Sequence, residues 1–94
     1  MSLARVVTFN GVTRARIDQL REQIEQEERP DDLPASEIVV LYDAESERSL
    51  VILHFENEDD YRRGDATLNA MPAPETPGSR TSVTKYEVAI RRTM

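Results

Sequence analysis

Apolar and polar residues alternate along four short stretches of the chain, and residues with helical spacing occupy the segments between them. The first stretch, residues 3–11, places Val7 and Phe9 on one side and Thr8 and Asn10 on the other, which is the two-residue period of a strand. An Asn-Gly pair at its end supplies a turn signal. We therefore expect a strand that ends near residue 11.

Residues 14–28 carry apolar side chains at intervals of three and four, which predicts an amphipathic helix. Its apolar stripe is narrow and consists of Ile17, Leu20 and Ile24. Thr13 is suited to cap the N-terminus of this helix, and Arg21 with Glu25 is expected to form an i,i+4 pair on its surface.

Two further strands are predicted over residues 36–42 and 50–55, joined by a polar connector of hairpin length. The second of them, Leu-Val-Ile-Leu-His-Phe, is apolar on both faces up to His54. Continuous apolar runs of this kind are typical of strands that are covered on both sides.

Asn57 is positioned to cap a second helix, whose acidic first turn suits the helix dipole. Gly64 is expected to weaken this helix by up to about 1 kcal/mol relative to Ala. Residues 71–80 contain three prolines and predict a surface loop. Alternation over residues 81–91 predicts a fourth strand with one buried face.

The order strand-helix-strand-strand-helix-strand is that of the split βαβ, or ferredoxin-like, fold. We expect residues 1–94 to form a single α+β domain, since the length is that of one domain. Its two helices would cover one face of a four-stranded antiparallel sheet, with the first and third strands in the middle.

This fold leaves the second face of the sheet bare, and the strands do not suit a face in water. Leu50, Ile52 and His54 alternate with Val51, Leu53 and Phe55, so the third strand is apolar on both sides. Large exposed apolar patches usually mark an interface. We therefore expect two copies to pack sheet to sheet as a homodimer.

Composition narrows the classes of function. The net charge is −6 and basic residues are interleaved with acidic ones, whereas nucleic-acid binders usually show a basic face. The absence of cysteine excludes disulfides and thiolate chemistry, and no apolar run is long enough to predict a membrane span. The N-terminus lacks the apolar region of a secretory signal, so a cytoplasmic location is the default expectation.

The stretch from Leu50 to Tyr61 resembles the strand-to-helix junction of the dimeric α+β barrel superfamily, which includes the antibiotic-biosynthesis-monooxygenase-like domains. Its members often show an apolar strand, a Trp-Glu-Ser-like cap, an acidic turn and an apolar anchor; Phe55-Glu56-Asn57 and Tyr61 stand in those places. The resemblance implies a homodimer whose sheets enclose a cavity, in a superfamily of cofactor-free oxygenases, haem-degrading enzymes and domains without an assigned function. The chain departs from the haem-degrading members because it has no Trp and its only His lies on a strand.

His54 is the first candidate for a functional residue, because histidine is the side chain that most readily exchanges protons near neutral pH. If its side of the strand borders the cavity of a dimer, His54 can act as a general base or bind a ligand. The alternative is a structural histidine that is hydrogen-bonded within the interface.

Four other residues are candidates to line the same cavity: Thr8, Asn10, Tyr42 and Tyr86. Asn10 also suits a turn, and the two tyrosines also suit core or interface packing with a hydroxyl at the rim. Strand parity alone does not decide which of the four share a face with His54. A single histidine and scattered carboxylates predict no metal site, and no cofactor is expected.

Two functions remain open on these grounds. The first is a small homodimeric α+β barrel protein that binds a small molecule between its two sheets. The alternative is a cofactor-independent, monooxygenase-like enzyme that acts on an aromatic or polyketide-like substrate, with His54, Asn10 or a tyrosine handling protons. A purely structural pairing module is a third interpretation, and the sequence does not decide whether the protein is an enzyme.

Overall fold

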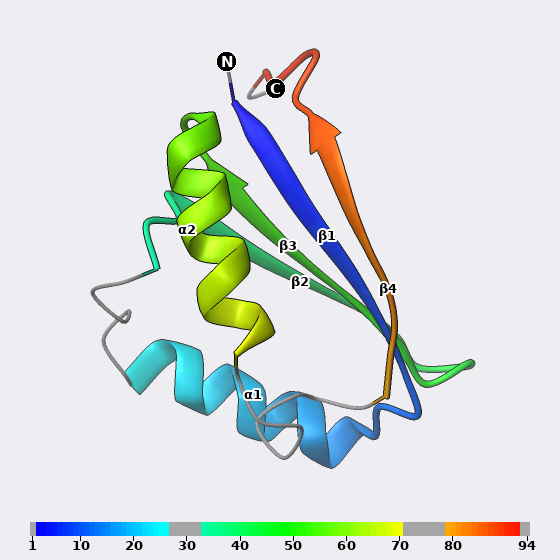
Figure 1. Ribbon diagram of the computed structural model, residues 1–94. Helices are drawn as coiled ribbons and strands as arrows, with labels where there is room; N and C mark the ends of the chain where they lie inside the picture. Colours follow the sequence, from blue (N-terminus) through cyan, green and yellow to red (C-terminus); the bar gives the residue numbers. More distant parts are fainter. Residues whose placement is uncertain (1, 27–32, 71–78, 93–94) are drawn as a thin grey trace.

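The computed structural model describes residues 2–26, 33–70 and 79–92, which form six elements in the expected order (Figure 1). The elements are β1 (Leu3–Asn10), α1 (Arg14–Gln26), β2 (Glu37–Asp43), β3 (Arg48–Phe55), α2 (Glu58–Asn69) and β4 (Ser79–Glu87). The strands form one sheet in the order β2-β3-β1-β4, and all neighbours are antiparallel. The predicted ferredoxin-like α+β fold, with the first and third strands in the middle, is confirmed.

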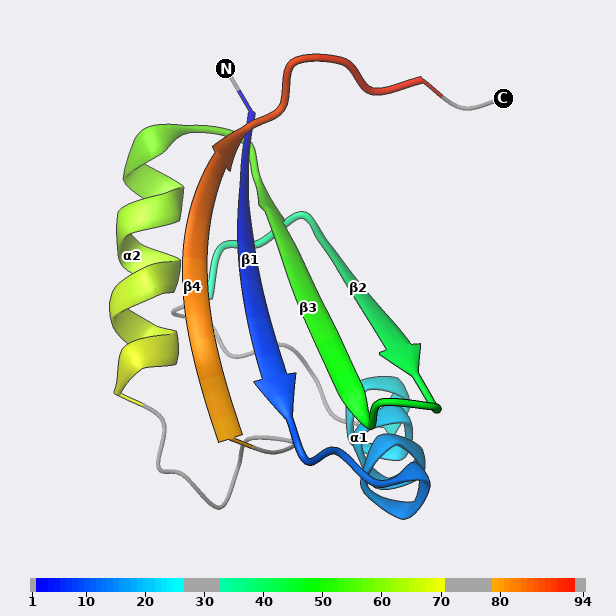
Figure 2. The same cartoon turned by 90° about the vertical axis from the view of Figure 1, so that its right-hand side faces the viewer.

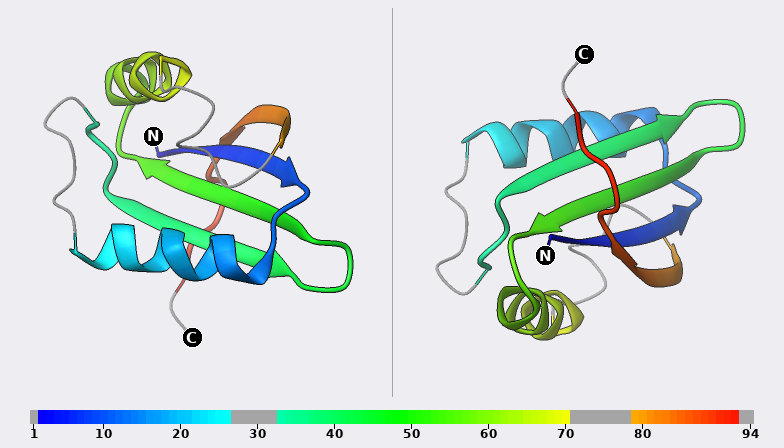
Figure 3. Two further views of the ribbon diagram at one scale, coloured as in Figure 1. Left: turned by 90° about the horizontal axis from the view of Figure 1, so that it is seen from below. Right: turned by 90° about the horizontal axis from the view of Figure 1, so that it is seen from above.

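Both helices pack on the same face of the sheet. Leu3 belongs to a buried cluster with Tyr61 of α2, and Val7 and Phe9 belong to a second cluster with Ile17 of α1. These three β1 residues are alternate positions and therefore point to one side. The helices lie apart over that side, with α1 beside β2 and α2 against β1 and β3 (Figure 3). Neither helix is long and apolar enough to cross a membrane in the described part of the chain.

Side-chain caps start both helices, as the sequence predicts. The backbone N–H of Arg16 donates to Thr13 Oγ1 at 3.2 Å, and that of Asp60 donates to Asn57 Oδ1 at 2.8 Å. Each bond satisfies a donor that the first turn of a helix would otherwise leave free.

The C-terminal strand departs from the prediction in its bounds and its burial. It runs over Ser79–Glu87 rather than 81–91, because its partner strand begins at Leu3, which lies opposite Glu87. The expected buried face is wrong, because β4 is an edge strand and even Val83, which faces the helices, is only half-buried. Helix α1 is described over Arg14–Gln26, and the last two residues predicted for it, 27–28, lie outside the described residues, as does the predicted loop up to position 78.

A buried arginine joins β1 to α2, and the sequence pattern did not reveal it. The Arg5 side chain is 3% exposed, and its Nε lies 2.8 Å from Asp65 Oδ1. Its Nη2 donates to Asn69 Oδ1 at 3.1 Å. A buried charge is tolerated only when it is paired and hydrogen-bonded, and these two residues of α2 meet that need.

Candidate functional site: the open face of the sheet

The face of the sheet that the helices leave uncovered, here called the open face, is built from alternate residues of all four strands (Figure 2). Strand register arranges them in rows that run from β2 to β4. Three of the rows are Glu37-His54-Ala4-Tyr86, Val39-Ile52-Val6-Thr84 and Leu41-Leu50-Thr8-Ser82.

The centre of the open face is an apolar band. It consists of Val6, Val39, Leu41, Leu50 and Ile52. Leu41 is 48% exposed and Val39 is 38% exposed, although both side chains are apolar. No described element covers this band, so its apolar surface is in contact with solvent in the single chain.

A polar cluster closes one end of the band, around His54. Ser36 Oγ lies 3.0 Å from His54 Nδ1 and donates to the His54 carbonyl oxygen at 3.1 Å. Arg91 Nη1 lies 3.4 Å from both ring nitrogens of His54, and its Nη2 forms an ion pair with Glu37. The histidine is thus oriented by a hydroxyl and covered by a guanidinium.

The segment after β4 brings Arg91 to this cluster. It leaves β4 and crosses the end of the sheet toward β2 (Figures 2 and 3). The Val88 N–H donates to the Ser2 carbonyl at 3.0 Å, which holds the start of the segment against β1. Ile90, next to Arg91, is 88% exposed. The segment therefore adds one apolar side chain and one cation at the polar end of the open face.

A second charged pair lies at the opposite end of the band, where Asp43 and Arg48 are opposed across β2 and β3. The Ser46 hydroxyl donates to Asp43 Oδ2 at 2.6 Å, and this bond, with help from the Ser46 N–H and from Arg48, lowers the pKa of the Asp43 carboxyl. The band is therefore framed by charged groups at both ends.

Of the five residues that the sequence singled out, three lie in the three rows given above, and Asn10 has the same strand parity at the end of β1. His54 and Tyr86 share a row, and Thr8 lies two rows away. Asn10 is exposed at the end of β1, opposite Ser79. Tyr42 lies on the other side of the sheet, where its hydroxyl donates to the Val12 carbonyl at 2.8 Å, so it does not share the site.

Three residues of the cluster were missed: Ser36, Glu37 and Arg91. Glu37 was within reach of sequence reasoning, because pairing across the hairpin places it opposite His54. Arg91 was not, since its position depends on the path of the segment after β4.

The chemistry available at the open face is narrow. His54 has one hydroxyl and one guanidinium as polar neighbours, and Glu37 is engaged by Arg91. Within the described residues, no three His, Asp or Glu side chains converge as a metal site. The apolar band is the larger feature, with a composition that suits the core of an interface and a polar rim.

The chain was also compared with known proteins. No protein-family model, no curated protein and no solved structure matches it.

Proposed function

We propose that this protein acts as a homodimer in which the open faces of two copies pack sheet to sheet, with a small molecule held at the polar end of the seam. The observation that carries the proposal is the exposed apolar band framed by charged ends. Contiguous exposed apolar patches with a polar rim often mark interaction sites. A second copy of the chain is the simplest partner to bury this band, because the same surface then packs against itself about a two-fold axis.

The dimensions of the face are consistent with this role when the C-terminal segment is included. Strand spacing and rise give the face a projected area of roughly 450 Å². A stable interface buries about 800 Å² per partner. Side chains that project from the sheet add to this area, and so does the segment that carries the exposed Ile90. We therefore place that segment in the interface.

The small molecule belongs at the polar end because leucine, isoleucine and valine side chains would fill the middle of the seam. The row that contains His54 and Tyr86 offers a phenol, with the Arg91 guanidinium close by, beside apolar surface. We do not extend the proposal to a monooxygenase-like reaction, since Arg91 covers both ring nitrogens of His54, which would have to move the proton.

Light scattering of the wild-type chain at micromolar concentration tests the pairing. We expect twice the chain mass of 10.7 kDa. Leu41→Lys places a charge in the band and should return the mass to that of one chain, whereas Ala15→Lys, an exposed substitution on α1, should leave the dimer intact. A wild-type protein that scatters only as a single chain refutes the proposal.

Thermal shift with a panel of aromatic and polyketide-like molecules tests the small-molecule site. A ligand that binds between the sheets stabilises the wild-type dimer and not the Leu41→Lys chain. A ligand that stabilises both equally places its site elsewhere and contradicts this part of the proposal.

A further inference from the structure

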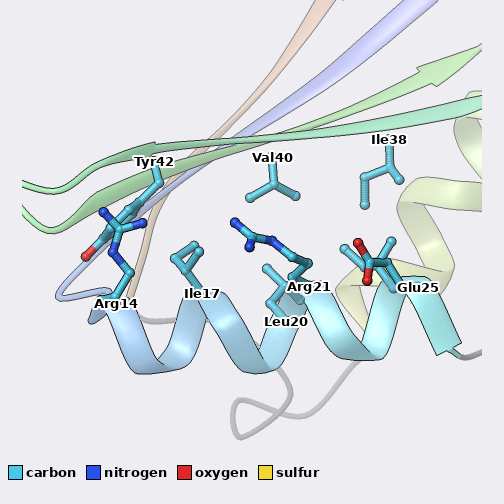
Figure 4. Close-up of a pocket in the computed structure, with 9 residues that line it drawn as sticks. Arg14, Ile17, Leu20, Arg21, Glu25, Ile38, Val40 and Tyr42 are labelled. Carbon is cyan, nitrogen blue, oxygen red and sulfur yellow. The ribbon is translucent and has the colours of Figure 1, made fainter.

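A groove separates α1 from the edge strand β2, on the side of the sheet opposite the open face (Figure 4). Its volume is about 260 Å³. Six of its lining side chains are apolar or aromatic and come from the two elements that face each other: Ile17, Leu20, Ile24, Ile38, Val40 and Tyr42. The others are Arg14, Arg21 and Glu25.

The groove is open because α1 is anchored at one end only. Ile17, in the first half of the helix, is buried in the cluster with Val7 and Phe9. Leu20 is half-buried, and Ile24, one turn further on, is 40% exposed. Ile38 on the facing strand is also 40% exposed. The apolar stripe of α1 and the inner face of β2 therefore point at each other without closing.

The charged side chains in the groove are spread along its length, with Arg14 at one end, Arg21 in the middle and Glu25 at the other end (Figure 4). Arg14 lies at the Tyr42 end, where its Cζ is 5.1 Å from the centre of the Tyr42 ring, and the Arg21 guanidinium also points between helix and strand (Figure 4). Glu25 lies at the Ile38 end. The expected Arg21–Glu25 pair does not form, and within the described residues neither arginine makes an ion pair.

Two guanidinium groups beside an apolar channel match one kind of ligand. An arginine binds a carboxylate through parallel, charge-assisted hydrogen bonds, and its guanidinium is more weakly hydrated than an ammonium group. The remaining groove wall offers only hydrocarbon up to Glu25, which would repel a second anionic group. The volume lies just below the range of about 300–1,000 Å³ that drug-sized ligands need, so the ligand is small.

We propose that this groove binds monocarboxylates with a medium-length alkyl chain. The carboxylate lies between Arg14 and Arg21, and the chain runs along Leu20 and Val40 toward Ile24 and Ile38. This site is independent of the proposed homodimer, because its residues come from one chain and from the opposite side of the sheet.

Titration of the chain with octanoate, followed by amide chemical shifts and by calorimetry, tests the proposal. We expect shifts in α1 and β2, and binding at least tenfold tighter than that of octyltrimethylammonium, which has a comparable tail and the opposite charge. Arg21→Gln should weaken octanoate binding by roughly tenfold, since one charge-assisted pair is lost. Arg62→Gln on α2 is the matched control and should bind as the wild type does.

Three outcomes would overturn the assignment: equal affinity for the two amphiphiles, unchanged binding by Arg21→Gln, or shifts confined to the open face. Arg21 is exposed, so its variant should keep the wild-type amide spectrum and remain interpretable. The Leu41→Lys chain should still bind octanoate. Failure of dimerisation and failure of this groove are therefore observed separately.

Discussion

Gly64 lies on the buried side of α2, directly over the ring of Phe55. A Cβ at this position would come closer than 3.0 Å to two ring carbons, and Phe55 is fully buried. The sequence suggested only that glycine weakens the helix, which is true of its propensity. The structure adds the reason for the residue: the ring of Phe55, itself edge-on to Tyr61 at 5.4 Å, occupies the space that a side chain would need.

Gly64→Ala is therefore expected to destabilise the protein. The gain in helix propensity is about 1 kcal/mol, and overpacking a core costs about 1–3 kcal/mol, so a net loss of about 1 kcal/mol should result. Chemical denaturation measures it. Ala66→Gly, at an exposed position of the same helix, serves as the control and should lose about 1 kcal/mol from propensity alone. A more stable Gly64→Ala protein would contradict the close contact.

Arg5 and Asp65 form an ion pair whose two members differ in burial. The arginine side chain is 3% exposed, whereas that of the aspartate is 35% exposed. Removal of the aspartate leaves a buried cation without its counter-ion, and removal of the arginine leaves an anion that water can reach. The two deletions should therefore differ in their effect on stability.

We expect Asp65→Ala to lower the free energy of unfolding by about 2 kcal/mol more than Arg5→Met does. Methionine fills the buried volume of the arginine stem without a charge. Urea denaturation of both variants checks the order, with Asp18→Ala as an exposed control that should change little. Equal losses of unfolding free energy in the two variants would show that burial of the arginine does not determine the effect of breaking this ion pair.

The two helices are attached to the sheet in different ways. Helix α2 is held by polar contacts as well as by its core residues, because Arg5 pairs with Asp65 and Lys85 of β4 pairs with Glu58 at 2.5 Å. Lys85 Nζ also lies 4.9 Å from the centre of the Tyr61 ring. Helix α1 has Ile17 and a capping threonine at one end and the groove at the other. Because α1 is held at one end only, the groove proposed to bind carboxylates lies beside α1 and not beside α2.

The attachment of α2 should depend on pH. The hydrogen bond from Lys85 lowers the pKa of the Glu58 carboxyl in the folded protein. The unfolded chain therefore takes up this proton first as the pH falls. The stabilisation is present above the ordinary glutamate pKa, about 4.5, and is lost as the pH drops through the lower folded value.

Lys85→Met should make thermal stability less dependent on pH between roughly pH 5 and pH 3, while Lys85→Arg should retain the wild-type slope. Scanning calorimetry over this range provides the measurement. Asp43, whose pKa is lowered by the hydrogen bond from Ser46, contributes to the pH dependence of stability in all three proteins. Identical slopes for wild type and Lys85→Met would show that the Glu58 contact does not contribute.

At the scale of the whole molecule, the charge of the chain differs from the charge balance of the face that we propose to pair. The chain carries a net charge of −6, which makes two copies repel each other at long range. On the open face, however, Glu37 is balanced by Arg91 and Asp43 by Arg48. Other described acidic residues lie away from this face, among them those in the first turn of α2. The face proposed to pair is thus apolar at its centre and balanced at its ends.

The sequence by itself determined the element order, the sheet topology and the two helix caps. These depend on local patterns: the two-residue period assigned Leu50, Ile52 and His54 to one face, and the side chains of Thr13 and Asn57 cap the helix that begins next to each. Such signals extend over only a few residues, so they can be recognised in a single sequence.

Only the tertiary structure decided what meets across distance. It set Arg91 over His54, Phe55 under Gly64 and Arg5 into the core, and it turned Tyr42 away from the other candidate residues toward α1. It also left the groove, because the tilt of α1 from the sheet is fixed by where its few apolar residues find partners. Contacts of this kind depend on the relative placement of whole elements, and no local period along the chain encodes that placement.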